Sequence, residues 1–440
     1  MNAVMANHTV EKTKVQQLQN KLYCAAKLSP TRRFHALFDK LHRIDVLERA
    51  WVEVAKNRGA PGVDGVTIES IEEAGVVPFL ATLAASLADG TYRPKPVRRV
   101  RIEKPDGGER LLGVPCVADR CVQAAAKLLL EPIYEADFAS CSYGFRPKRS
   151  AHQALDAIRA AVKEGRHWIV DVDIKTFFDS VDRGMLLALV AERVSDRRML
   201  KLLRAFLDSG VLDGEELLDP ETGTPQGGVA SPLLANIYLT VLDRAVEAFG
   251  SRVRLIRYAD DCVACVPTEA EAHAVLALIA DVLGDLGLEL HPDKTRIVGL
   301  DQGEGFDFLG FHHQMVGSMR WRSGRRYLHT WPSVKAMNRA RARVRSLTNR
   351  HMAYLGLDAN VDSLNRFLLG WGGYFRHGNS GAKFSQLDSY VHLRLARLEM
   401  VRHGRRGWGW STHYRLPWLR SIGVHRLSGT VRWGATHAAQ

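Results

Sequence analysis

The sequence predicts an α+β fold in which a split βαβ region precedes a helical bundle. Between residues 166 and 313, short apolar stretches typical of strands alternate with amphipathic helical segments. Two of these stretches, residues 253–256 and 263–266, flank the four-residue turn 258–261 (YADD). Beyond residue 330, three successive segments repeat apolar residues every three or four positions, which predicts packed helices.

Length and charge describe a globular chain with a basic C-terminal part. The 440 residues are 46% hydrophobic, and no apolar run approaches the ~18 residues of a membrane-spanning helix, so we expect no membrane partner. Formal net charge is +13. Beyond residue 314 there are 22 Lys and Arg against 4 Asp and Glu, whereas the first 314 residues carry 39 and 44. This excess predicts a polyanionic partner such as nucleic acid.

The six cysteines follow no disulfide-dense pattern, and no charged-then-apolar leader is visible, so we expect a cytoplasmic location. Cys262 and Cys265 have the spacing of half a zinc site. A second half is missing and both residues continue the strand after the YADD turn, which favours core packing over metal binding.

The first 165 residues predict mainly helices and one basic hairpin. Helices are expected within the first 50 residues and over about 71–88, 117–134 and 151–163, with a Gly/Pro turn at 57–64. Residues 94–103 alternate like a strand, and the turn at 105–108 (PDGG) returns the chain toward 110–112.

The next 148 residues predict the split βαβ order. A strand over 168–174 places Ile169, Asp171 and Asp173 on one face, so that Asp173 ends the strand at a sheet edge. Helices are expected over about 183–192, 197–207, 232–249 and 269–286, with the carboxylate hairpin between the last two. The predicted order of elements is therefore strand, helix, strand, strand, helix, strand, which is the split βαβ pattern.

The bundle is rich in aromatic residues, since seven of the nine tryptophans lie beyond residue 320. We interpret Phe367 and Trp371, which share a helical face, as bundle core, and base stacking is the alternative.

Acidic residues at the ends of two predicted strands carry the chemistry. Asp260 and Asp261 lie at the hairpin tip, and Asp171 and Asp173 end the upstream strand. Carboxylates so placed suit two Mg²⁺ ions that assist phosphoryl transfer. Adjacent acids are also common in solvated turns, so this interpretation depends on the other segments of the chain.

Nine segments of the chain together match one family pattern. They are residues 59–65 (GAPGVDG), 104–123 (KPDGGERLLGVPCVADRCVQ), 142–150 (SYGFRPKRS), 173–179 (DIKTFFD), 223–236 (GTPQGGVASPLLAN), 258–261 (YADD), 286–295 (LGLELHPDKT), 306–311 (FDFLGF) and 365–375 (NRFLLGWGGYF). The chain resembles the group II intron-encoded reverse transcriptases and maturases. This resemblance implies a right-hand polymerase, with fingers and a split βαβ palm, followed by an α-helical thumb or maturase bundle.

By the same resemblance, Asp173 and Asp260 correspond to the two carboxylates that bridge a pair of Mg²⁺ ions, and Asp261 to a less direct third acid. The backbone carbonyl of Ile174 is expected to complete the metal shell, because oxygen ligands suit magnesium. Asp171 ranks second to Asp173, because the family's Asp-Ile-Lys pattern begins at Asp173.

The resemblance also implies contacts with an incoming dNTP. Lys104 and Arg110 flank the basic hairpin and are expected to grip the triphosphate, or alternatively to be solvated surface charges. Phe178 is expected to exclude a 2′-hydroxyl, with a core role for Phe177 or Phe178 as the alternative. Gln226 lies in a glycine-rich turn that allows close approach of a base pair.

Two further residues are weaker candidates. Lys294 matches the position proposed in related polymerases to protonate the pyrophosphate, and it is alternatively a surface charge. Arg146, in the FRP turn, is a secondary candidate for phosphate contact.

The resemblance implies that the basic C-terminal part binds group II intron RNA in a ribonucleoprotein complex that uses target DNA as primer, and therefore an association with the nucleoid. Phosphate contacts of this kind make binding strongly salt-dependent. The candidate RNA-binding residues are Arg339, Arg341, Arg343, Arg345, Arg350, Arg402, Arg405 and Arg406.

We expect an N-terminal extension and fingers over 1–165, palm over 166–313, thumb over 314–400 and a short basic extension over 401–440. No cysteine follows Cys265, so a Cys/His-bearing endonuclease is not expected. Two rival functions remain: a domesticated reverse transcriptase in defence or DNA repair, and a non-catalytic RNA-folding or splicing factor. The complete acidic set argues against the second, because a pure binder gains nothing from carboxylates beside bound phosphate.

Overall fold

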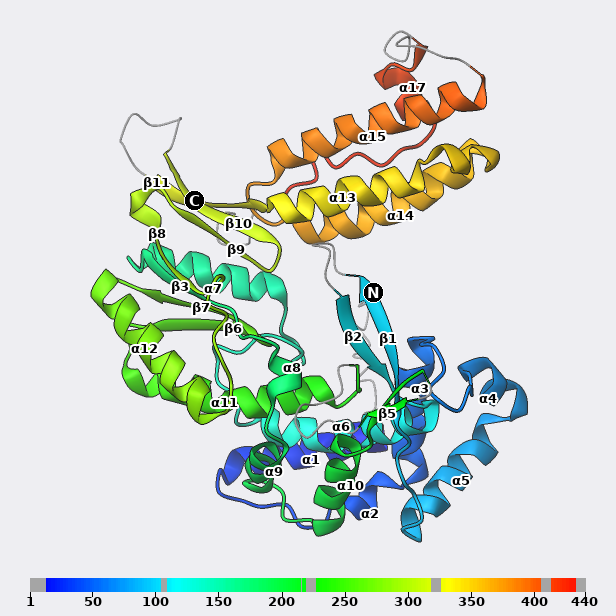
Figure 1. Ribbon diagram of the computed structural model, residues 1–440, viewed down its shortest axis with the longest axis vertical. Helices are drawn as coiled ribbons and strands as arrows, with labels where there is room; N and C mark the ends of the chain where they lie inside the picture. The colour runs from blue at the N-terminus through cyan, green and yellow to red at the C-terminus, as the bar shows by residue number, and fades with distance from the viewer. Residues whose placement is uncertain are drawn as a thin grey trace, which may run out of the picture. The chain divides into compact units, whose positions relative to one another are not determined.

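The computed structural model describes residues 13–103, 109–214, 216–218, 227–317, 326–404 and 413–432. Helices and strands are mixed through most of the chain, and the C-terminal region is mainly helical, as predicted (Figure 1). The chain forms two compact units. The first comprises residues 1–150, 172–264 and 273–295, and the second comprises 151–171, 265–272 and 296–440.

Helix α6 (Val117–Glu135) is the central element of the first unit's N-terminal part, and 15 of its 19 residues are buried. Helices α1 (Lys14–Leu28), α2 (Phe38–Leu41) and α3 (Ile44–Lys56) pack against it. The helix predicted over 71–88 is instead two helices, α4 (Ile68–Ala74) and α5 (Val76–Ala88). They meet at Gly75, whose φ of 106° lies outside the helical region and so breaks the run.

The predicted basic hairpin is confirmed as an antiparallel pair of strands, β1 (Val97–Glu103) and β2 (Glu109–Val114). Its turn, residues 104–108, lies outside the described residues. Strands β4 (Val211–Asp213) and β5 (Glu216–Leu218) extend the sheet in the order β2-β1-β4-β5. Asp213 pairs with both Arg99, at 3.3 Å, and Arg101, at 2.8 Å, and so stabilises the join between β1 and β4.

The helices predicted after residue 175 are present, with bounds within two residues of those expected: α9 (Arg183–Ala191), α10 (Arg197–Leu207), α11 (Ser231–Phe249) and α12 (Glu269–Asp285). A short helix, α8 (Phe177–Ser180), precedes them. Asp182 and Asp196 begin α9 and α10, because their carboxylates accept hydrogen bonds from the first backbone N–H groups of each helix.

The acidic residues of interest lie on a four-stranded sheet in the order β6-β7-β3-β8. Its strands are β3 (Trp168–Val172), β6 (Arg254–Tyr258), β7 (Asp261–Val266) and β8 (Arg296–Gly299). Strands β3 and β8 are antiparallel, with Trp168 opposite Gly299. Cys262 and Cys265 are both buried in β7, which agrees with the core interpretation. The division between the two units passes through β3 and β7.

The second unit contains a three-stranded antiparallel sheet that the sequence analysis did not predict. Strands β9 (Gly305–Phe308), β10 (Phe311–Gly317) and β11 (Arg326–Pro332) pair in the order β11-β10-β9. Alternate residues of β10, Phe311, His313 and Met315, are buried. Helix α7 (Ala151–Lys163), predicted from the sequence, and the short 3₁₀ helix η1 (Leu300–Gln302) belong to the same unit.

The predicted helical bundle is confirmed. Helices α13 (Val334–Leu347), α14 (Leu357–Phe375) and α15 (Gly381–Arg402) lie side by side (Figure 1). The 3₁₀ helix η2 (Arg350–Tyr354) lies between α13 and α14 in the chain, and α17 (Leu416–Ser421) lies beyond α15. Trp371 packs against Phe375 at 4.6 Å and Phe384 at 5.7 Å between ring centroids, in accord with a core role.

Among the described residues, no single helix is long and apolar enough to cross a membrane. Helices α4 and α5, which are bent by 102° relative to each other, are together long and apolar enough, by length and composition only.

Candidate functional site

Asp173 follows directly after β3 and is fixed through its backbone. Its carbonyl accepts a hydrogen bond from His291 N at 2.8 Å and one from Thr295 Oγ1 at 3.3 Å. Its side chain, about one-third exposed, lies 3.4 Å from Lys294 Nζ. The end of β3 is therefore held against residues 291–295, and an ammonium group lies beside the carboxylate.

Asp260 and Asp261 lie at the turn between β6 and β7, where Asp260 is half-buried and Asp261 is exposed. The preceding Ala259 has a φ of 59°, which only a few per cent of non-glycine residues adopt. Arg257, wholly buried in β6, donates from Nη1 to the carbonyl of Ala259 at 3.0 Å. This hydrogen bond stabilises the strained backbone conformation of the turn.

Arg257 is the hub of a buried hydrogen-bond network. It pairs with Asp243 through two hydrogen bonds and also donates to Asn236 Oδ1 and Ser142 Oγ, each at 3.0 Å. Burial alone lowers the pKa of the guanidinium, but the negative charge of Asp243 and the hydrogen bonds that Asp243 accepts outweigh it, so the pKa of Arg257 is raised. A fully paired buried cation gives a rigid support.

Helix α11 contacts both strand ends that carry the acids. The ring of Tyr238 lies 6.5 Å from that of Phe177, four residues after Asp173. Asn236, in the same helical turn, accepts from Arg257 beneath the β6–β7 turn. Phe177, which follows Asp173, and Arg257, which precedes Asp260, therefore contact the same turn of α11, and the strands β3 and β7 next to the two acids are adjacent in the sheet.

The candidate metal ligands at these strand ends, namely the carboxylates of Asp173, Asp260 and Asp261 and the carbonyl of Ile174, are all oxygen donors. Ile174 lies opposite Leu290, and the hydrogen bonds between these two segments are made by the chain neighbours of Ile174. The carbonyl of Ile174 is therefore directed to the other side of the strand, on which β7 lies in the sheet order. Carboxylate and carbonyl oxygens suit magnesium. Within the described part of the chain, however, no three His, Cys, Asp or Glu side chains are grouped closely enough to hold a metal ion.

The alternative acid, Asp171, is already engaged. Its Oδ2 atom lies 3.4 Å from Nε of Arg296, the residue opposite it on β8. Asp173 has a comparable ion pair with Lys294, at 3.4 Å, so the ranking of Asp171 below Asp173 stays a prediction.

Comparison with known proteins identifies the family. The model of the reverse transcriptase (RNA-dependent DNA polymerase) family matches residues 102–313, and that of the group II intron maturase-specific domain matches 337–416. Protein YkfC of Escherichia coli is 33% identical over 364 residues, or 74% of this chain and 94% of that protein. The chain belongs to the group II intron-encoded reverse transcriptases and maturases. Its reaction class is RNA-directed DNA polymerisation.

Other relatives match over shorter segments. The group II intron-encoded protein LtrA of Lactococcus lactis is 39% identical over 216 residues, which cover 48% of this chain and 35% of LtrA. The nuclear intron maturase 2 of Arabidopsis thaliana is 31% identical over 169 residues, or 29% of this chain and 23% of that maturase.

The residues predicted to contact nucleotide are placed only in part. Phe178 is half-buried in α8, with its ring 5.1 Å from that of the buried Phe177. Phe177 therefore takes the core role that the sequence left open between the two. Lys104 and Gln226 lie outside the described residues, as does the side chain of Arg110, so their roles stay predictions.

Arg146 serves structure rather than phosphate contact. Its guanidinium pairs with Glu135 through two hydrogen bonds and donates from Nη1 to the carbonyls of Ala139 and Ser142. The side chain is 4% exposed. The FRP turn is therefore anchored to the end of α6.

The candidate RNA-binding arginines differ in their surroundings. Arg402 donates to the carbonyls of Ala353 and Leu355 and pairs with Glu399, so it stabilises the bundle. Arg405 and Arg406 lie outside the described residues. The others lie on or just after α13, with Arg341 half-buried and four exposed: Arg339, Arg343, Arg345 and Arg350.

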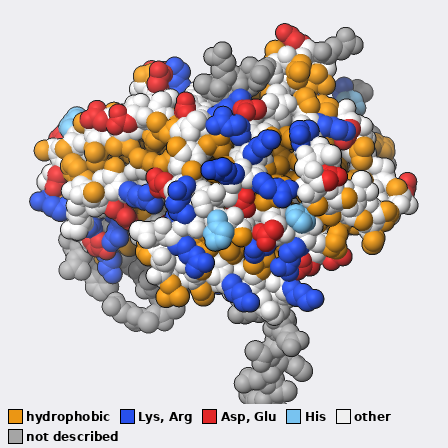
Figure 2. Space-filling view, turned by 90° about the horizontal axis from the view of Figure 1, so that it is seen from below, with side chains coloured by type: hydrophobic (Ala, Val, Ile, Leu, Met, Phe, Trp, Pro, Cys, Tyr) orange, Lys and Arg blue, Asp and Glu red, His pale blue; other side chains and the backbone are white. Residues whose placement is uncertain are grey.

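One face of the molecule carries mixed surface charges. Figure 2 shows the face seen from below, where Lys and Arg side chains are interspersed with acidic and hydrophobic ones. This mixture agrees with the near-balance of charge in the first 314 residues.

Sequence reasoning missed the network around Arg257. Two signals were present: an arginine inside the apolar strand β6, and the polar residues Asn236, Thr240 and Asp243 on one face of the apolar helix α11. Both indicate buried polar pairing. It also missed Gln123, a buried residue of α6 whose Oε1 accepts from Val229 N at 2.8 Å and so fixes the segment after Gln226.

Proposed function

We propose that this reverse transcriptase is a right-hand polymerase that copies an RNA template from the 3′ end of a DNA primer, and that it binds its group II intron RNA as a splicing maturase. Copying from a nick in target DNA supports mobility of the intron. The observation that carries the proposal is that Asp173 and Asp260 lie next to the adjacent strands β3 and β7, with nearby residues of both segments in contact with one turn of α11, in a chain of this family.

Asp173, Asp260 and Asp261, with the carbonyl of Ile174, are the residues that would hold two Mg²⁺ ions. Bound there, the ions supply charge stabilisation for the attacking hydroxyl and the leaving pyrophosphate. In the reaction, the primer 3′-oxygen forms a bond to the α-phosphorus of the dNTP, and the bond between that phosphorus and the bridging oxygen of pyrophosphate breaks. The hydroxyl proton passes to a water molecule, and Lys294 gives a proton to the pyrophosphate and regains one from solvent.

The remaining predicted residues position the nucleotide. Phe178 lies under the sugar and excludes a 2′-hydroxyl. Lys104 and Arg110 bind the triphosphate, and Gln226 lies against the nascent base pair. Fingers end near residue 165, palm near 313 and thumb near 400, and the exposed arginines on and after α13 contact RNA phosphates.

Primer extension on an RNA template with Mg²⁺ and dNTPs tests the polymerase site. Full activity in the unaltered chain and a loss of at least about 1,000-fold in Asp260→Asn are expected, because a lost metal-binding carboxylate removes transition-state stabilisation. Asp285→Asn, which removes an exposed carboxylate at the end of α12, is the matched control and should retain activity. Equal activity in all three proteins would contradict the proposal.

The maturase role is tested separately, by splicing of the catalytic intron RNA that flanks the gene. The chain should lower the Mg²⁺ concentration that this RNA needs for splicing, and the Asp260→Asn variant should retain this effect. If no such intron flanks the gene, the domesticated reverse transcriptase becomes the better account.

A further inference from the structure

Phe145 is an exposed aromatic side chain beside the YADD turn. It is 55% exposed, although large apolar side chains are usually buried. Its ring centroid lies 6.3 Å from that of Tyr258, two residues before Asp260. Its φ is 56°, a conformation unusual for a bulky residue.

Both chain neighbours of Phe145 are held rigidly. A Cβ atom at Gly144 would lie 2.4 Å from Ala259 N, so only glycine allows this contact with the turn. On the other side, Arg146 is buried and anchored to Glu135. The loop is also attached to β6, because Tyr143 N donates to the carbonyl of Arg257 at 2.8 Å. The backbone thus keeps an aromatic ring in solvent at a cost in strain, which is typical of functional positions.

We infer that Phe145 and Tyr258 form an aromatic platform on which the 3′-terminal nucleotide of the primer stacks. This inference rests on the proposed polymerase function. The 3′-hydroxyl must lie at Asp260 for the reaction, so the nucleotide that carries it must lie within a few ångströms of Tyr258 and therefore of Phe145. Aromatic rings bind bases of any sequence through their faces, which suits a primer terminus that changes with each step.

The test uses an RNA template with a DNA primer that ends in 2-aminopurine, whose fluorescence falls when it stacks. Binding is measured without dNTP, and extension is measured in parallel. In Phe145→Ala we expect weaker quenching and a KM for primer–template raised roughly 5- to 150-fold, which is the range for loss of one base–aromatic stack. Phe145→Trp should restore both, and Phe145→Leu, which keeps size without a π-face, should not.

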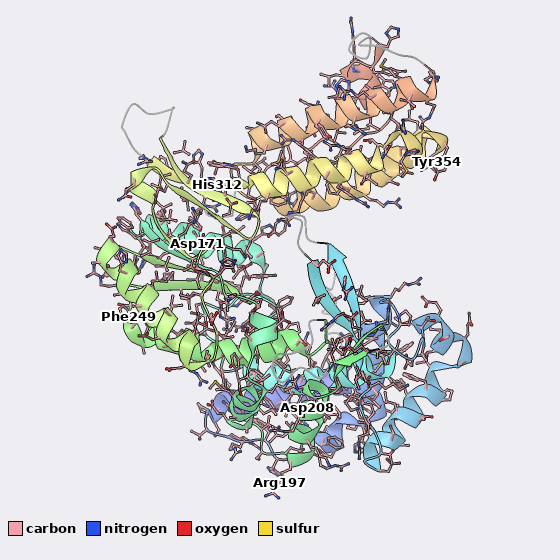
Figure 3. The ribbon with its side chains drawn as sticks, in the orientation of Figure 1. Asp171, Arg197, Asp208, Phe249, His312 and Tyr354 are labelled. Carbon is pink, nitrogen blue, oxygen red and sulfur yellow. The ribbon has the colours of Figure 1, made fainter. Side chains whose placement is uncertain are left out.

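Phe249→Ala is the matched control. Phe249 is another exposed phenylalanine, 46% accessible, at the end of α11 (Figure 3). This variant should behave as the unaltered protein, and melting temperatures of all variants should agree because both side chains are exposed. Extension by the unaltered protein with unchanged quenching and KM in Phe145→Ala would overturn the inference. Absence of extension in the unaltered protein would instead refute the polymerase function, while the quenching comparison would still decide whether Phe145 stacks on a primer end.

Discussion

The guanidinium of Arg257 donates from Nε to Oδ1 of Asp243 at 2.7 Å and from Nη2 to Oδ2 at 2.5 Å, with neither side chain exposed to solvent. The strand before the YADD turn is thereby joined to helix α11. Because Arg257 also donates to the carbonyl of Ala259, the ion pair stabilises the backbone that presents Asp260.

Removing one partner of this pair should destabilise the protein strongly. In Asp243→Asn the buried guanidinium loses its counter-charge, so we expect the free energy of unfolding to fall by about 3–5 kcal/mol. Denaturant titration measures this. Asp208→Asn removes the exposed carboxylate that pairs with Arg183 at 3.2 Å (Figure 3) and should cost at most about 1 kcal/mol. Similar losses in both variants would mean that burial does not govern the Arg257 pair.

Adding a methyl group at Gly144 should displace the YADD turn. The new Cβ meets the backbone of residues 258 and 259, at 2.4 Å from Ala259 N and 2.9 Å from the carbonyl carbon of Tyr258. We expect kcat in primer extension to fall at least 10-fold in Gly144→Ala. Gly284→Ala, in α12 with no atom within 4 Å of the added Cβ, should keep full activity and gain up to about 1 kcal/mol of stability. Unchanged kcat in Gly144→Ala would show that the turn tolerates the shift.

Replacing Lys294 should lower the rate without affecting stability. Lys294 lies 3.4 Å from Asp173 and is 56% exposed, so Lys294→Met should change the free energy of unfolding by less than about 1 kcal/mol. If it gives a proton to pyrophosphate, kcat should fall about 100-fold with little change in the KM for dNTP. The control is Lys175→Met, which breaks a similarly exposed pair with Glu289 at 3.1 Å. Equal kcat values in Lys294→Met and Lys175→Met would show that Lys294 is only a surface charge.

Alanine substitutions of Phe177 and Phe178 should have different effects, on protein stability and on selectivity between deoxynucleotides and ribonucleotides respectively. Phe178→Ala should raise ribonucleotide incorporation relative to deoxynucleotide, measured as the ratio of the two kcat/KM values, because the half-buried ring no longer excludes a 2′-hydroxyl. Phe177→Ala should instead cost about 3–5 kcal/mol of stability, since Phe177 is 3% exposed. Unaltered discrimination in Phe178→Ala would show that another residue is the gate.

The second unit should lose stability in mild acid through His313. This side chain is fully buried, and burial lowers its pKa to about 3. The unfolded chain binds the proton near pH 6.5 while the folded chain does not, so stability falls as pH drops from 6.5 toward 3. Between pH 7 and pH 5 the loss is about 2 kcal/mol. Denaturant titrations at the two pH values should show this difference, and it should shrink in His313→Gln but not in His312→Gln. An unchanged difference in His313→Gln would contradict the assignment.

The sequence predicted the helices and the acidic strand ends well, because these depend on local periodicity. Helix α10 spans 197–207 as expected, and its boundary is set by the cap at Asp196. The sheet β9-β10-β11 escaped prediction. Its central strand buries His313 between Phe311 and Met315, so polarity did not follow the alternation of buried and exposed positions.

Long-range pairing was also beyond the sequence. An arginine in strand β6 indicates a buried partner, but nothing local identifies Asp243, 14 residues earlier. Likewise, Phe145 reads as part of a turn motif. Only its exposure, its φ and its contact with Tyr258 distinguish it from a core residue.

Counting Mn²⁺ ions bound by the complex with primer–template and a non-hydrolysable dNTP, by electron paramagnetic resonance, tests the central claim most directly. Two ions should bind the unaltered protein, and binding should weaken at least about 10-fold in Asp173→Asn and in Asp260→Asn but not in Asp285→Asn. If both active-site variants bind Mn²⁺ as the unaltered protein does, these two acids do not hold the catalytic metals and the proposed site is wrong.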